Sequence, residues 1–362
     1  MREYVVENAA TALSVGGLVI GLIFGWIVYR TNFCTMGSIS DFMSFGDYRR
    51  FRAWILAAAT ALIGAQILDA NGIVDLSRSM YPAARFEWFG NIVGGLLFGW
   101  GMVFAGGCAS RNLVRAGGGD LRSLIVLLVI GLFAYMSIGG IIGPIRAELS
   151  DRTAITLSGV GSTSIDDILA YLTGLGAADA RMVATTIIAG IALIYCFIDP
   201  AFRSSPVHIF AGLGIGLCAV AGWALTGLAY DDMAAQTLAP ISLTFVRPTG
   251  DAVEWLQRFT AGPVPGFGVT TTLGALFGAF IAAVSSGRFK FTSFASPSDT
   301  IRNLYGAALM GIGGVMALGC TIGQGVTGVS TLAVGSFLTL AAIITGGILG
   351  IKRMEAILMA EI

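Results

Sequence analysis

The chain has 362 residues, of which 56% are hydrophobic and only 12% are charged, and its 21 Lys and Arg residues balance 21 Asp and Glu residues. An ordinary soluble domain carries about 25% charged residues, so the composition excludes a water-soluble globular protein and makes the lipid bilayer the first expected partner. The zero net charge offers no basic surplus for nucleic acid, and we expect no nucleic-acid partner.

The apolar segments predict about nine transmembrane helices. The first runs uncharged from Asn8 to Tyr29, which is longer than a signal-peptide core of about 7–15 residues. The stretch from Asn303 to Ile351 carries no charge and is long enough for two crossings, and the glycines of Gly319–Gly325 allow the reversal between them. The other charge-free windows lie near residues 53–68, 88–110, 123–145, 182–198, 207–230 and 266–287.

Short basic loops predict the orientation of these spans, because loops rich in Lys and Arg stay on the cytoplasmic side. Residues 48–52, 288–290 and 352–353 are basic and fall on one side if the N-terminus is outside. The loops at 146–181 and 231–258 are acidic on balance and fall on the other side. We therefore expect the N-terminus outside the cell and the C-terminus in the cytoplasm.

A glycine-rich unit recurs along the chain. The segment Gly21–Trp26 is repeated as Gly95–Trp100, and the same shift superimposes Cys34 on Cys108. A further shift superimposes Cys108 on Cys320 together with the glycines that precede it. The cysteine is thus part of the repeated unit.

The repeat predicts one transmembrane domain, residues 1–362, made of two halves at about 8–145 and 204–351 that span 182–198 joins. A weaker fourth copy has Trp223 where the cysteine would stand. The odd number of connecting crossings places the two halves in opposite orientations, which predicts an inverted repeat. Transporters of several folds bind substrate between such repeats, on helices broken near the midplane, so we also expect short re-entrant half-helices.

The glycines allow two interpretations. Pairs spaced by four residues, such as Gly21 and Gly25 or Gly95 and Gly99, are typical of close helix packing. Glycines beside a cysteine, such as Gly106–Gly107, expose backbone N–H groups at a helix break, and such groups can cradle an anion. For this second set, turn geometry and anion binding both remain open.

The cysteines also divide into two sets. Cys196 and Cys218 lie outside the repeat register, and we expect them to pack in the core as small apolar residues. Cys34, Cys108 and Cys320 share one repeat position at breaks in apolar segments. We expect these three thiols to line a path through the membrane.

Few other residues could carry chemistry. The single histidine, His208, has no second histidine or carboxylate at ligand spacing, and no glycine-rich phosphate loop occurs, so we expect no metal, no cofactor and no direct use of ATP. The cations nearest the cysteines are Arg30, Arg111 and Arg115. Snorkelling at a span end and attraction of an anion are both open for them.

Three segments resemble the YeeE/YedE family of sulfur-compound transporters: Arg30–Cys34, Gly106–Gly119 and Leu318–Gly328. The resemblance implies thiosulfate uptake at the bacterial inner membrane, through an hourglass-shaped pore in which the anion contacts three cysteines in turn. It also implies a thiol-bearing sulfur carrier in the cytoplasm as a possible partner. The expected pathway residues are Cys34, Cys108 and Cys320, with Gly106, Gly107, Arg111, Asn112, Gly319, Gly323, Gln324 and Gly325 around them.

Three alternatives stay open. A thiolate could take the outer sulfur of thiosulfate as a persulfide, which would make the chain a membrane sulfurtransferase rather than a transporter of the intact anion. We rank this lower because a buried thiol far from Lys or His is a poor nucleophile. The substrate could also be another sulfur or selenium species, and a passive channel would work without the cysteines.

Overall fold

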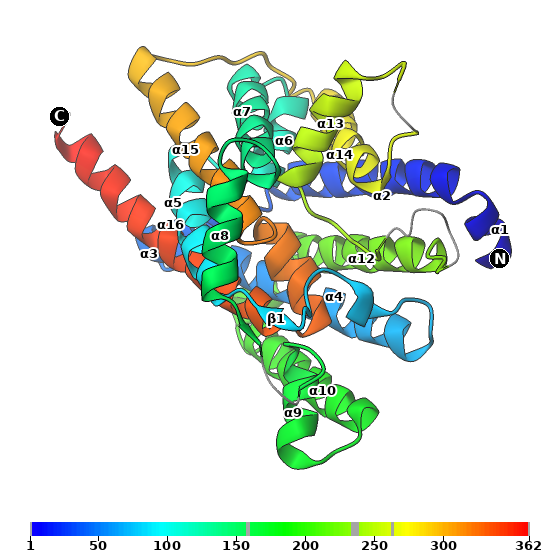
Figure 1. Cartoon of the computed structure of the whole chain (residues 1–362). Coiled ribbons are helices and arrows are strands. Elements are labelled where there is room, and N and C mark those ends of the chain that lie inside the picture. Colours follow the sequence, from blue (N-terminus) through cyan, green and yellow to red (C-terminus); the bar gives the residue numbers. More distant parts are fainter. Residues whose placement is uncertain (1, 157–159, 233–238, 262–263, 361–362) are drawn as a thin grey trace.

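The computed structural model is almost entirely helical and describes residues 2–156, 160–232, 239–261 and 264–360. The long helices cross the molecule, and α10 lies at its edge with α9 (Figure 1). The long helices are α2 (Ala9–Thr31), α4 (Arg49–Ala70), α7 (Leu121–Ile138), α10 (Ala177–Phe197), α12 (Pro206–Leu228), α14 (Phe267–Ser285), α15 (Pro297–Met316) and α16 (Val334–Ala360).

Short helices connect or extend the long ones. The α-helical pieces are α1 (Arg2–Glu7), α3 (Thr35–Phe45), α5 (Gly95–Phe104), α6 (Ala109–Gly117), α8 (Gly143–Thr153), α9 (Ile165–Thr173), α11 (Pro200–Arg203) and α13 (Arg247–Gln257). The π-helical turns are η2 (Gly90–Gly94) and η3 (Gly323–Gly328), and the 3-10 turns are η1 (Leu76–Arg78) and η4 (Val329–Thr331).

The described residues contain one small sheet. Strands β1 (Arg85–Phe86) and β2 (Ile155–Thr156) pair antiparallel, with Arg85 opposite Thr156 and Phe86 opposite Ile155. This sheet joins two loops that lie far apart in the sequence.

Eight segments of the described chain are long and apolar enough to cross a membrane, which confirms the predicted all-α membrane fold. They are Ala9–Phe45, Arg49–Ala70, Gly90–Gly117, Leu121–Ile138, Ala177–Phe197, Pro206–Leu228, Phe267–Ser285 and Val334–Ala360. The ninth predicted span, at the start of the stretch from Asn303 to Ile351, falls in α15 and is not among the eight. The first two turns of α15 are polar and include Asp299 and Arg302.

Glycines bring pairs of helices into backbone contact. A Cβ on Gly25 of α2 would overlap the carbonyl oxygen of Ala275 in α14, and a Cβ on Gly99 of α5 would overlap that of Ile343 in α16. Small residues at helix interfaces allow this approach where lipid gives no hydrophobic drive to association. The close packing that we expected from the spaced glycine pairs is confirmed here.

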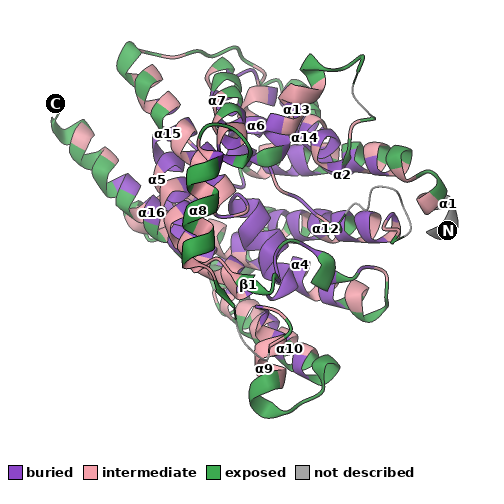
Figure 2. Cartoon of the chain, in the orientation of Figure 1, coloured by how far each residue is buried: buried purple, intermediate pink, exposed green. Residues whose placement is uncertain are grey.

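The helix pairs combine early and late parts of the chain. Helix α2 packs on α14, α4 on α12, α5 on α16, and α7 on α15. Helix α10 packs on α4 and α9 at the edge (Figure 1). Buried residues concentrate where these pairs meet, and α1 and the end of α16 lie at opposite ends of the molecule (Figure 2).

Candidate functional site

Each of the three repeat cysteines follows a helix that ends in the same way. The residue two positions before the cysteine has a left-handed backbone, with φ of 58° at Asn32, 70° at Gly106 and 56° at Leu318. A left-handed residue is a common way to stop a helix. Helix α2 therefore ends before Cys34, α5 before Cys108, and α15 before Cys320.

Hydrogen bonds close two of these helix ends alike. The Gly107 N–H donates to the Met102 carbonyl at 2.8 Å, and the Gly319 N–H donates to the Gly314 carbonyl at 2.7 Å. Gly107 has a φ of 150°, and a Cβ there would lie 2.9 Å from Cγ of Arg111. The turn therefore requires glycine at this position.

Two amide side chains donate hydrogen bonds to backbone carbonyl groups at these helix breaks. The Nδ2 of Asn112 donates to the Gly107 carbonyl at 2.8 Å, and the Nε2 of Gln324 donates to the Ala317 carbonyl. Each amide stands four residues after its cysteine and serves carbonyls that the helix end leaves unpaired. Gln324 keeps a buried Oε1 with no hydrogen-bond partner in the structure.

Each of the three sulfur atoms contacts a polar group two or three residues further along the chain. Cys34 accepts a hydrogen bond from the Gly37 N–H at 3.4 Å, and Cys320 accepts one from the Gly323 N–H at 3.3 Å. The Cys108 sulfur lies 3.3 Å from the hydroxyl of Ser110. All three thiols are buried. Backbone N–H groups thus donate to the sulfurs of Cys34 and Cys320, and a hydroxyl lies beside the sulfur of Cys108.

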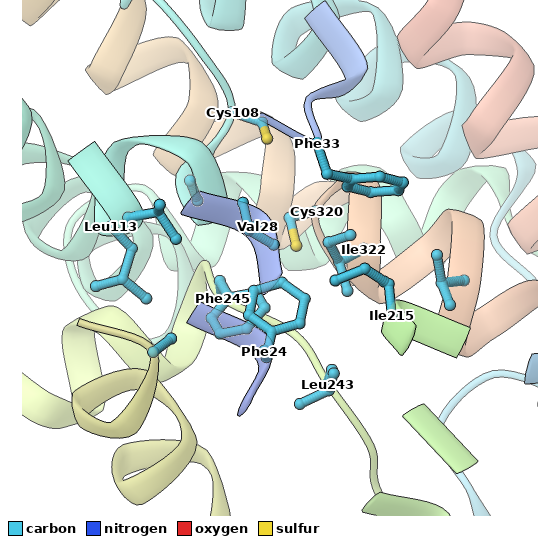
Figure 3. Packing of buried hydrophobic residues seen from close by; sticks show 14 of the residues in the cluster. Phe24, Val28, Phe33, Cys108, Leu113, Ile215, Leu243, Phe245, Cys320 and Ile322 are labelled. Atoms are coloured by element: carbon cyan, nitrogen blue, oxygen red, sulfur yellow. The ribbon is translucent and has the colours of Figure 1, made fainter. Parts of the chain in front are cut away.

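The structure brings the three cysteines together. Cys108 is an electrostatic neighbour of both Cys34 and Cys320. Cys108 and Cys320 also belong to one cluster of buried side chains that includes Val28 and Phe33 (Figure 3). The thiols of Cys108 and Cys320 therefore lie among apolar side chains.

Arg111 differs from its neighbour Arg115. Its guanidinium donates to the Asn32 side chain and interacts electrostatically with Cys34 and Cys108. Arg115 instead forms an ion pair with Asp120 at 2.6 Å and a hydrogen bond to the Gly106 carbonyl. Arg115 therefore bonds to the helix break, whereas Arg111 bonds to Asn32 and lies within electrostatic range of two thiols.

The remaining glycines of the expected site have mixed surroundings. A Cβ on Gly325 would overlap the ring of Trp54, so close packing accounts for this glycine. A Cβ on Gly323 would lie 2.6 Å from Oγ1 of Thr244. Gly319 faces its own turn, beside the side chain of Gln324.

Sequence reasoning missed one segment of the site. Residues 239–246 were expected in an outer loop, but they form an extended segment whose Leu243 and Phe245 are fully buried. The backbone N–H of Phe245 interacts with the Cys320 sulfur, and its ring stacks on Phe24 at 4.8 Å. The alternation of apolar and polar residues from Ile241 to Phe245 was the available signal.

The other chemical groups lie apart from these thiols. His208 Nδ1 lies 2.6 Å from the Ser205 hydroxyl, at the start of α12. Cys196 and Cys218 are buried, and Cys196 donates to the Arg52 carbonyl. Among the residues that the structure describes, no group of three His, Cys, Asp or Glu side chains could hold a metal ion.

Interrupted helices that meet inside a bundle of membrane-crossing helices define the chain as a multi-pass membrane transporter. The chain belongs to the sulphur transport family, whose model matches residues 30–349, and the expected resemblance is confirmed. It is similar to the thiosulfate transporter TsuA of Escherichia coli (strain K12), with 27% identity over 87% of each chain. The TsuA of Spirochaeta thermophila is 28% identical over 91% of this chain and 96% of its own. The probable transporter YedE of Salmonella typhimurium is 27% identical over 35% of this chain and 27% of its own.

Proposed function

We propose that the chain imports thiosulfate across the bacterial inner membrane by passing the intact anion along Cys320, Cys108 and Cys34. The observation that carries the proposal is the placement of three buried thiols at equivalent helix breaks, with Cys108 as electrostatic neighbour of the other two. The TsuA relatives, which are thiosulfate transporters by name, support the choice of substrate.

The helix pairs support two inverted halves at about 8–145 and 204–351. An exchange of the two halves replaces α2 by α12 and α14 by α4. The contact of α2 with α14 then becomes the contact of α12 with α4, which the structure also contains. The same exchange turns the contact of α5 with α16 into that of α7 with α15. In this arrangement α5 and α15 enter from opposite faces and stop at Cys108 and Cys320, which gives an hourglass-like pathway.

Thiosulfate is a dianion with a soft outer sulfur, so a pathway must meet both its charge and its sulfur. The N–H groups of Gly37 and Gly323 point at thiol sulfurs and can also donate to the anion. Arg111 supplies a positive charge near Cys34 and Cys108. Weak sites in series hold an ion without trapping it, as conduction requires.

The order along the pathway depends on the orientation. The basic loops favour an outer N-terminus and a cytoplasmic C-terminus. Cys34 follows the C-terminal end of α2 and then lies toward the cytoplasm, and Cys320 lies on the outer side. A thiol-bearing sulfur carrier would receive the anion at the inner end.

The test is uptake of thiosulfate labelled separately at each sulfur, into cells that lack other routes. We expect both labels to enter together and uptake to be lost in Cys108→Ala and Cys320→Ala. Cys218→Ala is the matched control, because Cys218 is equally buried but lies outside the three helix breaks. Full uptake in the Cys108 and Cys320 variants would refute the cysteine pathway.

A second candidate is a sulfurtransferase. A thiolate would attack the outer sulfur, form a persulfide and release sulfite as the S–S bond of thiosulfate breaks. The position of Arg111 favours any anion near Cys34 and Cys108, whether substrate or thiolate. Entry of the outer sulfur alone, with sulfite left outside, would establish this reaction in place of relay.

A further inference from the structure

A groove of about 800 Å³ opens beside α13 and leads toward the Cys320 break. Leu13, near the start of α2, lines it, so the groove opens on the face where α2 begins. Thr244 lines its inner part. Thr244 lies against Gly323, and the next residue, Phe245, directs its N–H to the Cys320 sulfur.

The mouth of the groove holds an unusual contact between one phenol and two acids. The Tyr135 hydroxyl lies 2.7 Å from Oδ1 of Asp251 and 2.6 Å from Oε2 of Glu254. A phenol has one proton and can donate to only one carboxylate. A proton on one of the two acids would make the second short O···O contact a hydrogen bond to the phenol oxygen as well. The contact is therefore arranged to hold one proton.

Glycine packing fixes this geometry. A Cβ on Gly250 would lie 2.6 Å from the Tyr135 ring, and a Cβ on Gly131 would lie 3.0 Å from the Gly250 Cα. The absence of both side chains lets α13 approach α7 closely enough for the phenol to reach both acids. The contact is therefore built by the fold of both helices.

Two arginines complete the charges at the mouth. Arg247 lies 3.7 Å from Asp251, and Arg258 lies 2.9 Å from Glu254. Helix α14, which also packs on α13, has no charged residue between Phe267 and Ser285. With one stored proton, two guanidinium groups and two acids leave one net positive charge, and loss of the proton leaves none.

We propose that this groove is the entry vestibule for the sulfur anion, and that the proton held by Tyr135, Asp251 and Glu254 gives it the positive charge that attracts a dianion. The inference rests on the proposed anion transport and adds the entrance and its dependence on pH. The sign of this pH dependence follows from the charge of the groove. Protonation strengthens anion binding, so the KM for uptake rises as the pH at this face rises.

Burial agrees with this assignment. Removal from water raises the pKa of Asp251, whereas the hydrogen bond from Tyr135 lowers that of Glu254. The stored proton therefore belongs on Asp251, with Glu254 ionised and accepting from the phenol.

The experiment measures the KM for thiosulfate in vesicles as the pH at the groove face is raised from the ordinary pKa of an aspartate, about 3.9, toward neutral pH. Wild type is expected to show a KM that rises about fivefold across this range, the effect of one elementary charge in a hydrated site. Asp251→Asn keeps the net positive charge at every pH and should hold the KM low and constant. Tyr135→Phe removes a hydrogen bond that lowers the pKa of Asp251, so the rise in KM should move to higher pH.

Glu148→Gln is the matched control, because Glu148 is an exposed acid that pairs with Arg152 and does not line the groove. It should keep the wild-type profile. If Asp251→Asn and Tyr135→Phe both kept the wild-type pH profile while Cys108→Ala still abolished uptake, the vestibule proposal would be overturned. Uptake that survives Cys108→Ala would refute the cysteine pathway instead, so the two failures are distinct.

Discussion

Leu318 and Gly106 hold the same left-handed backbone conformation, with φ of 56° and 70°, at the same position before Cys320 and Cys108. Glycine adopts this conformation without steric cost, but a side chain costs about 1–2 kcal/mol there. The break before Cys320 is therefore the more strained of the two, and the strain is carried by a half-buried leucine.

We expect Leu318→Gly to leave thermal stability in detergent within about 1 kcal/mol of wild type, because relief of backbone strain offsets the lost packing. Leu318→Val should be clearly less stable, because a β-branched residue tolerates this conformation worst. If the glycine variant were the less stable of the two, packing of the leucine side chain would dominate at this position.

Helix contacts make a second prediction. Gly99→Ala should destabilise the protein by about 1–3 kcal/mol, the usual cost of overpacking, because the new Cβ meets the Ile343 carbonyl in α16. Gly190→Ala is the control, since nothing lies within 4 Å of a Cβ at this helical position. It should raise stability by about 0.5–1 kcal/mol. Equal effects in thermal unfolding would argue against backbone contact between α5 and α16.

The two arginines of α6 should separate binding from stability. Arg111→Gln removes a charge near two thiols but leaves the ion pairs intact, so we expect the KM for thiosulfate to rise about ten- to a hundredfold with little change in melting temperature. Arg115→Gln should lower the melting temperature instead, because Asp120 is buried and loses one partner. If Arg115→Gln raised the KM and Arg111→Gln lowered the melting temperature, Arg115 would be the residue that binds the anion.

A fourth prediction concerns stability and pH. Because burial raises the pKa of Asp251, its contribution to stability is complete below the ordinary pKa of an aspartate, about 3.9, and is lost as the pH rises through the raised value. The melting temperature of wild type relative to Asp251→Asn should therefore fall from acidic toward neutral pH. A constant difference would show that Asp251 titrates normally.

Much of the scaffold could be predicted from residue patterns. The repeated glycines predicted close helix packing along α2 and α5, because the sequence itself shows where side chains are missing, but they did not predict the partner helices α14 and α16. The three cysteines could be placed at helix breaks for the same reason, since glycine turns precede Cys108 and Cys320. The left-handed residues Asn32 and Leu318 could not be foreseen, because neither type demands that conformation.

Contacts between distant segments were beyond sequence reasoning. The approach of Phe245 to Cys320 depends on an extended segment entering the bundle, and nothing local to residues 239–246 specifies its partner. The meeting of Tyr135 with Asp251 likewise depends on how α13 lies on α7.

The backbone contacts of α2 with α14 and of α5 with α16 bear on how the protein can move. A rocking motion of one half against the other would have to part helices that touch through glycine, with no layer of side chains to slide over. Packed interiors resist such gradual deformation. Conduction through this frame would then come from rotamer changes within the buried cluster that holds Cys108 and Cys320, which includes Phe24, Val28 and Phe33, while the helices stay in place.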